Sequence, residues 1–146
     1  MRTYSFLPTD LPKYLKHAEE VGRPVRGNDY GVNCGYWTSE FGRLNQVWHL
    51  WRYDSYAQRE ELRGKLSQNE DWTGKYVAVI KDWVKRQDIR ILNPDMEFTP
   101  PEGEGNIYEY RYYRLVVGGV GPWLKAFKEA LPHREKYSKL AGLWHA

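Results

Sequence analysis

The chain of 146 residues is long enough for one domain with a sizeable core, or for one domain and a piece of another. Its formal net charge of +3, spread along the sequence, argues against a dedicated nucleic-acid or membrane surface, so we expect no nucleic-acid partner. A single cysteine, Cys34, excludes an intramolecular disulfide framework, and no apolar run approaches the roughly 20 residues of a membrane span, so we expect a cytoplasmic protein with no membrane span.

The sequence begins with a predicted strand and a predicted helix. We expect the strand over residues 2–6 and a helix that starts at Thr9 or Asp10 as N-cap. Apolar side chains recur at helical spacing in this segment: Leu11, Tyr14, Leu15, Ala18 and Val21. Gly22 and Pro24 should end the helix, because both residues are typical of helix C-termini.

The next two predicted strands, over residues 34–39 and 44–53, are joined by a turn. The later strand, LNQVWHLWRY, is apolar on both faces, whereas a strand with one solvated face alternates apolar and polar residues. One face would carry Val47, His49, Trp51 and Tyr53. We expect the helices to cover the opposite face, that of Trp48 and Leu50, so that His49 points to the open side of the sheet and stays neutral near pH 7.

A second helical region follows. Ser55 and Gln58 have the spacing of a capping box at the start of this helix. A stripe of apolar residues then repeats at helical spacing and should belong to the core: Trp72, Tyr76, Val79, Ile80 and Trp83. With a fourth strand over residues 87–93, the order β-α-β-β-α-β predicts an α+β, ferredoxin-like unit over residues 1–94.

The remainder of the chain reads as a linker and a partial second repeat. Residues 95–106 are rich in proline, glycine and acidic residues, which is typical of a linker. Residues 107–146 predict a strand over 108–115, a helix over 122–131 and a short final strand. In that final strand Gly142 and Trp144 echo Gly35 and Trp37, so we expect a second β-α-β copy of the first half of the domain.

The segment GRLNQVWHLWRYDSYAQREELR resembles the characteristic segment of NIPSNAP domains. The positions that match are Asn45, Val47, His49, Leu50, Trp51, Tyr53, Arg59 and Arg63, together with Arg2, Thr3 and Tyr4 in the first strand. The resemblance implies the dimeric α/β-barrel architecture, in which two sheets pack face to face, and therefore a homodimer. The biochemical role of this family is poorly defined.

His49 is the residue that best suggests a functional site. An imidazole among aromatic side chains can act as a base or as an axial ligand, or can simply be a satisfied core residue. The candidate pocket consists of His49, Trp51, Tyr53, Asn45, Tyr4 and Tyr36. The four histidines lack metal-binding spacing, so we assign no catalytic residue, no metal and no cofactor.

The sequence favours a non-catalytic barrel that binds a small molecule or a protein, because no motif requires catalysis and a fold alone does not give function. The alternative is a cofactor-less monooxygenase or a haem-handling enzyme, since relatives of this barrel include both. RNA binding is disfavoured, because the third strand lacks the glycine-containing aromatic motif of RNA-recognition domains.

Overall fold

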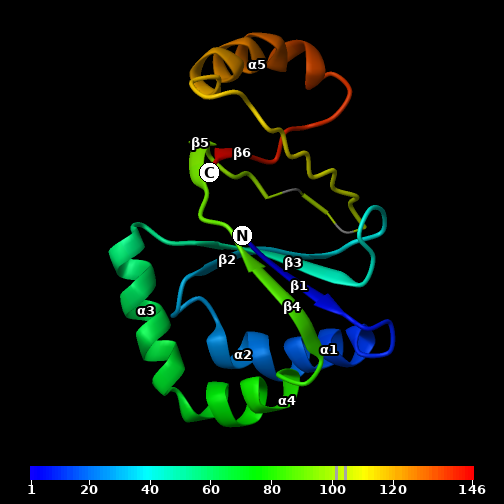
Figure 1. The fold of residues 1–146 in the computed structure, drawn as a ribbon, viewed down its shortest axis with the longest axis vertical. Coiled ribbons are helices and arrows are strands. Elements are labelled where there is room, and N and C mark those ends of the chain that lie inside the picture. Colours follow the sequence, from blue (N-terminus) through cyan, green and yellow to red (C-terminus); the bar gives the residue numbers. More distant parts are fainter. Residues whose placement is uncertain (101, 104) are drawn as a thin grey trace. The chain divides into compact units, whose positions relative to one another are not determined.

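The computed structural model describes residues 1–100, 102–103 and 105–146, which form two compact units, Met1–Ile91 and Leu92–Ala146 (Figure 1). The first unit contains a four-stranded sheet and most of the helices, and the second contains a pair of strands and one helix. Within the described ranges, no helix has the length and apolar character needed to cross a lipid bilayer.

The sheet of the first unit consists of β1 (Arg2–Phe6), β2 (Val32–Thr38), β3 (Gln46–Arg52) and β4 (Val84–Ile89). The strands lie in the order β2-β3-β1-β4, and every neighbouring pair is antiparallel. Helical segments connect β1 to β2 and β3 to β4. The α+β class expected from the sequence is confirmed, and β4 begins and ends a few residues earlier than expected.

The first connection is one helical run made of α1 (Leu11–His17), the π-helical segment η1 (Ala18–Gly22) and α2 (Arg23–Arg26). The expectation that Gly22 and Pro24 end the helix is therefore wrong. Pro24 lies in the first turn of α2, where its missing N–H costs little. The run ends instead at Gly27, whose φ of 50° suits glycine.

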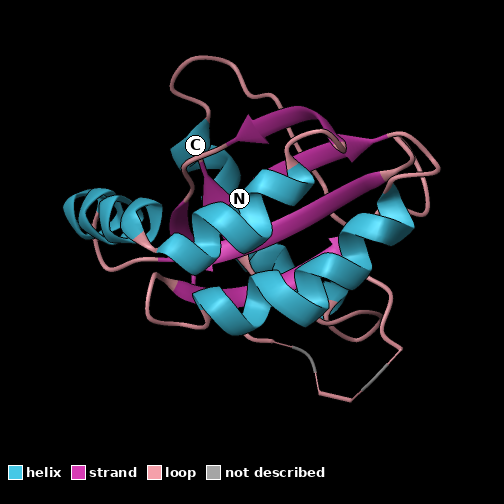
Figure 2. Ribbon diagram, turned by 90° about the horizontal axis from the view of Figure 1, so that it is seen from below, coloured by secondary structure: helices cyan, strands magenta, loops and turns pink. Residues whose placement is uncertain are grey.

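The second connection consists of α3 (Tyr56–Gln68), the π-helical segment η2 (Asp71–Val77) and α4 (Ala78–Ile80). One half of the expected capping box is present, since Ser55 Oγ accepts the Gln58 N–H at 3.1 Å; the Gln58 side chain reaches back one residue further than the N-cap, where its Oε1 accepts the Asp54 N–H at 2.8 Å. The helices of this unit lie together on one face of the sheet (Figure 2).

The core lies between this sheet face and the helices. Its buried members are Tyr4, Phe6, Tyr14, Ala18, Val47, Tyr76 and Ile80. Trp72 and Trp83 of the predicted stripe pack against this core, and Tyr76 and Ile80 are inside it, as expected. Val79 departs from the prediction, since 38% of it is exposed.

The predicted orientation of β3 is wrong. Tyr4 lies opposite Val47, and both belong to the core beneath the helices. Because side chains alternate along a strand, His49 and Trp51 share the helix-covered face with Val47, while Trp48 and Leu50 point to the other face. The sequence left this choice open because both faces of the strand are apolar.

Gly22 provides a test of this packing. A Cβ atom there would lie 2.4 Å from the ring of Tyr76, which is buried and cannot move aside easily. Gly22→Ala should therefore lower the free energy of unfolding by about 1–3 kcal/mol, the usual cost of overpacking, as measured by urea titration. Gly64→Ala is the matched control: a Cβ at Gly64 meets no atom within 4 Å, so this substitution should be neutral or stabilising. Equal stabilities of the two variants would contradict the packing.

The second unit contains β5 (Asn93–Met96), α5 (Val120–Arg134) and β6 (Leu143–His145), with β5 and β6 antiparallel. The expected linker over residues 95–106 thus begins within a strand, and its residues 101 and 104 lie outside the described residues. The strand expected over residues 108–115 does not form. A strand requires a neighbour for its backbone hydrogen bonds, and no described strand pairs with this segment.

Candidate functional site

Five of the six predicted pocket residues come together on the helix-covered face of the first unit: Tyr4, Tyr36, His49, Trp51 and Tyr53. His49 is 2% exposed, and its ring centroid lies 4.8 Å from those of Tyr4 and Tyr36, edge-on to one and stacked on the other. The sixth, Asn45, is not part of this group. It precedes β3 with a φ of 55°, and its carbonyl accepts the Phe6 N–H at 2.9 Å.

The tautomer of His49 follows from its contact with Trp51. The indole Nε1–H donates to His49 Nδ1 at 2.8 Å. Because an indole nitrogen can only donate, Nδ1 must be unprotonated, and the proton of the neutral imidazole is on Nε2. That Nε2 atom is buried and has no hydrogen-bond partner among the described residues. The site therefore contains a buried N–H donor without an acceptor.

Arg26 of α2 packs directly against this pair. Its guanidinium carbon lies 3.3 Å from the centroid of the Trp51 ring, and its Nη2 donates to the Tyr53 hydroxyl at 2.9 Å. The residue is only 3% exposed, and its Nε is buried without a hydrogen-bond partner. Burial lowers the pKa of Arg26 to about 10, so the guanidinium remains charged at neutral pH.

Two further arginines add positive charge around His49. Arg2 lies opposite His49 in the β1–β3 pair and donates to the Tyr4 hydroxyl at 3.1 Å. Arg63 of α3 is partly buried, and its Nη1 lacks a hydrogen-bond partner. Burial first, and then the charges of Arg2, Arg26 and Arg63, hold the pKa of His49 well below its usual range, so that the imidazole is neutral.

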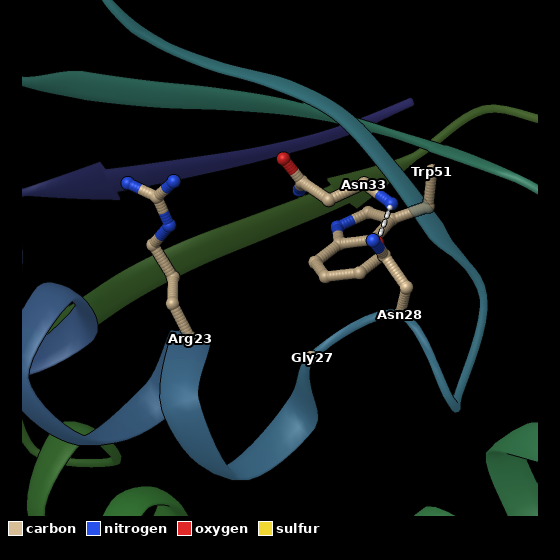
Figure 3. Close-up of a pocket in the computed structure, with 5 residues that line it drawn as sticks. All are labelled: Arg23, Gly27, Asn28, Asn33 and Trp51. Carbon is tan, nitrogen blue, oxygen red and sulfur yellow. Dashed lines mark hydrogen bonds between the residues drawn. The ribbon is translucent and has the colours of Figure 1, made fainter.

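A cavity of about 320 Å³ adjoins this cluster (Figure 3). It is lined by Arg23, Gly27, Asn28, Asn33 and Trp51. Figure 3 shows the Arg23 and Trp51 side chains on opposite sides of the space, with Asn33 between them. The Nδ2 of Asn33 is buried without a partner, while its backbone N–H donates to Asn28 Oδ1 at 2.9 Å. Trp51 thus links the cavity to His49 and Arg26.

Sequence reasoning missed Arg26, Asn33 and Arg23. Arg23 and Arg26 lie in α2. The first helix was expected to end at Gly22 and Pro24, so nothing in the sequence suggested that these two arginines continue the helix and approach β3. Asn33 lies opposite Trp51 in the β2–β3 pair, and only a correct strand register could have revealed this neighbour. Arg63 was noted for its match to a family pattern, but no physical role followed from that match.

The arrangement is suited to binding by donated hydrogen bonds and positive charge. Among the described residues, no group of His, Cys, Asp and Glu side chains is arranged to hold a metal ion. Cys34 is no candidate nucleophile, because burial raises the pKa of its thiol. The chemical resources of the site are therefore N–H donors, guanidinium groups and aromatic rings.

Comparisons with known proteins agree with the resemblance noted in the sequence. The human NipSnap homolog 3A is 31% identical to this chain and the mouse NipSnap homolog 3B is 36% identical, both over 99% of its length. The chain spans 59% of the length of these relatives.

Solved structures match about two thirds of the chain. A NIPSNAP family protein from Agrobacterium tumefaciens is 31% identical, with a TM-score of 0.62, and the match covers 69% of this chain and 94% of that one. An uncharacterized NIPSNAP-like domain protein from Burkholderia xenovorans is 33% identical, also with a TM-score of 0.62, over 68% and 85% of the two chains. The NIPSNAP family model matches residues 1–100. This chain therefore belongs to the NIPSNAP family.

Proposed function

We propose that the protein binds a small molecule, without catalysing a reaction, at the cavity beside Trp51 and the cluster of donors around His49. The observation that carries this proposal is the unpartnered Nε2–H of His49, a residue that is 2% exposed. Buried polar groups are almost always hydrogen-bonded, so a donor without an acceptor at a cavity-linked residue favours a ligand.

The same tautomer argues against the enzymatic alternatives. A general base or an axial haem ligand needs a free nitrogen lone pair on the imidazole. In His49 the only lone pair, on Nδ1, already accepts the indole N–H of Trp51, and Nε2 carries the proton. Either role would require this hydrogen bond to break, whereas donation from Nε2 to a bound molecule requires no change.

The proposal can be tested with a fragment library that contains acids, neutral molecules and bases in separate pools. We expect members of at least one pool to shift the indole N–H resonance of Trp51 in ¹H–¹⁵N spectra of the full chain. In His49→Phe, which removes both the Nε2 donor and the Nδ1 acceptor of the Trp51 indole N–H, the same fragments should bind at least tenfold more weakly. Phe41→Ala, at a residue that is 88% exposed, should bind like the wild type. If no fragment of any pool perturbs Trp51, the proposal is wrong.

We also infer that the chain assembles as a homodimer. The sheet face opposite the helices carries Trp37, Trp48 and Leu50, as the strand register requires. Apolar residues on such a face favour the sheet-to-sheet packing of a dimeric α/β-barrel. Light scattering at micromolar concentration should give close to twice the chain mass of 17.4 kDa, and a value near the single-chain mass would contradict the inference.

The division into residues 1–94, 95–106 and 107–146, the last being a partial second copy, remains a proposal as well. A shared local feature supports the repeat. A Cβ at Gly35 would lie 2.4 Å from the Trp37 ring, and a Cβ at Gly142 would lie 2.3 Å from the Trp144 ring. In both places an indole covers the glycine two positions before it; Gly35 lies within β2, and Gly142 directly precedes β6.

A further inference from the structure

The unpartnered buried atoms of the site are all of one kind. They are Arg26 Nε, Asn33 Nδ2, His49 Nε2 and Arg63 Nη1. Each is a nitrogen that donates hydrogen bonds, and none is an oxygen that accepts them. A molecule that satisfies these donors must therefore present acceptor atoms to them.

The charge of the cluster points the same way. Among the described residues, no carboxylate lies within ion-pair distance of Arg26 or Arg63. The groups that favour the charged form of Arg26 are phenols, those of Tyr53 and Tyr36, and not acids. Buried charges in proteins are normally paired, so this cluster has a surplus of positive charge that an anion would neutralise.

The surroundings of the cluster distinguish between classes of anion. The rings of Tyr4, Tyr36 and Trp51 pack around His49, and of these three Trp51 also lines the cavity. An indole wall favours an apolar body, while a planar guanidinium matches the two oxygens of a carboxylate. The cavity of about 320 Å³ is at the small end of the range for ligand pockets.

We infer that the ligand of this site is a small carboxylic acid with an aromatic or aliphatic body, its carboxylate accepting hydrogen bonds from the donors of Arg26, Arg63 and His49 while its body lies beside Trp51. This inference rests on the proposed function and adds the chemical class of the ligand to it. The two can fail separately, because a neutral ligand would support binding and exclude an acid.

Benzoate and benzamide are matched probes for the experiment, since they share a ring and differ in one charged group. Isothermal titration of the full chain should show benzoate binding at least tenfold more tightly than benzamide. Equal binding of the two compounds would overturn the inference while leaving the proposed function in place. Preferential binding of inorganic phosphate over benzoate would overturn it as well, because the site would then select charge without a carbon body.

Two variants of α3 test the role of the guanidinium. Arg63→Gln removes the positive charge of a residue that is only partly buried, so the protein should still fold, and benzoate should bind at least tenfold more weakly. Lys65→Gln removes one positive charge from an exposed position of the same helix and should leave benzoate binding unchanged. Equal losses in both variants would mean that net charge alone attracts the probe, which would overturn the assignment to Arg63.

Discussion

Replacing Tyr14 by alanine should lower the free energy of unfolding by about 3–5 kcal/mol, the range for removing a large buried aromatic side chain. Tyr14 is fully buried at 0% exposure, with its ring centroid 4.4 Å from that of Phe6 and 6.0 Å from that of Tyr4. It also accepts a hydrogen bond from the Tyr76 hydroxyl at 3.2 Å. The substitution thus removes the contact of α1 with both β1 and η2, and urea titration measures the loss.

Two control variants separate the parts of this effect. Tyr14→Phe keeps the ring and removes only the acceptor of the Tyr76 hydroxyl, so it should cost about 1–3 kcal/mol, the penalty for an unpartnered buried group. Phe41→Ala removes an aromatic ring that is 88% exposed and should change stability by less than about 0.5 kcal/mol. A loss below about 1 kcal/mol for Tyr14→Ala would mean that the helix does not form the core.

This core is the part of the fold that could be predicted from the sequence. Apolar residues at helical spacing have only one way to share a face, so Tyr14, Ala18, Tyr76 and Ile80 could be assigned to the interior. The Ser55–Gln58 cap hydrogen bond is equally local, since both partners lie within one turn. Such features need no knowledge of distant contacts.

The orientation of β3 could not be predicted in this way. A strand with one apolar face reveals which side is buried, but β3 is apolar on both faces. The sequence therefore shows which side chains share a face of β3, but not which of the two faces the helices cover. The answer depends on the register with β1, where Tyr4 pairs with Val47 across a long sequence separation. The cluster around His49 depends on the same register and on Arg26, which only a helix continuing past Pro24 brings to Trp51.

The segment over residues 108–115 was predicted to be a strand and is not one. Its alternating aromatic residues have strand propensity, yet the propensity alone does not provide a neighbouring strand. β5 and β6 pair with each other instead, and a hydrogen bond between His145 Nδ1 and the Asp95 carboxylate, at 3.0 Å, lies across this pair. β6 corresponds to the short final strand that was expected, whereas β5 was not expected, because Asp95 and Met96 were assigned to the linker.

The stability of the protein should decrease as the pH falls below about 6.5, and His49 should account for part of that decrease. Burial holds the pKa of His49 well below its usual range in the folded protein, whereas a histidine in the unfolded chain titrates near its ordinary pKa. Below that pKa the unfolded chain binds a proton that the folded protein does not bind. The contribution of His49 is therefore complete at pH 7.5 and lost on acidification, with a slope of at most about 1.4 kcal/mol per pH unit.

His49→Gln isolates this contribution, because glutamine does not titrate and its side-chain oxygen can still accept the indole N–H of Trp51. Urea titrations at pH 7.5, 6.5 and 5.5 should show a smaller loss of stability in the variant than in the wild type. The other titratable groups are common to both proteins, so the difference between their slopes belongs to His49. Long-range ¹H–¹⁵N spectra at pH 7 should show the proton of the wild-type imidazole on Nε2. Parallel pH profiles, or a proton on Nδ1, would contradict the buried, Trp51-bonded tautomer on which the site depends.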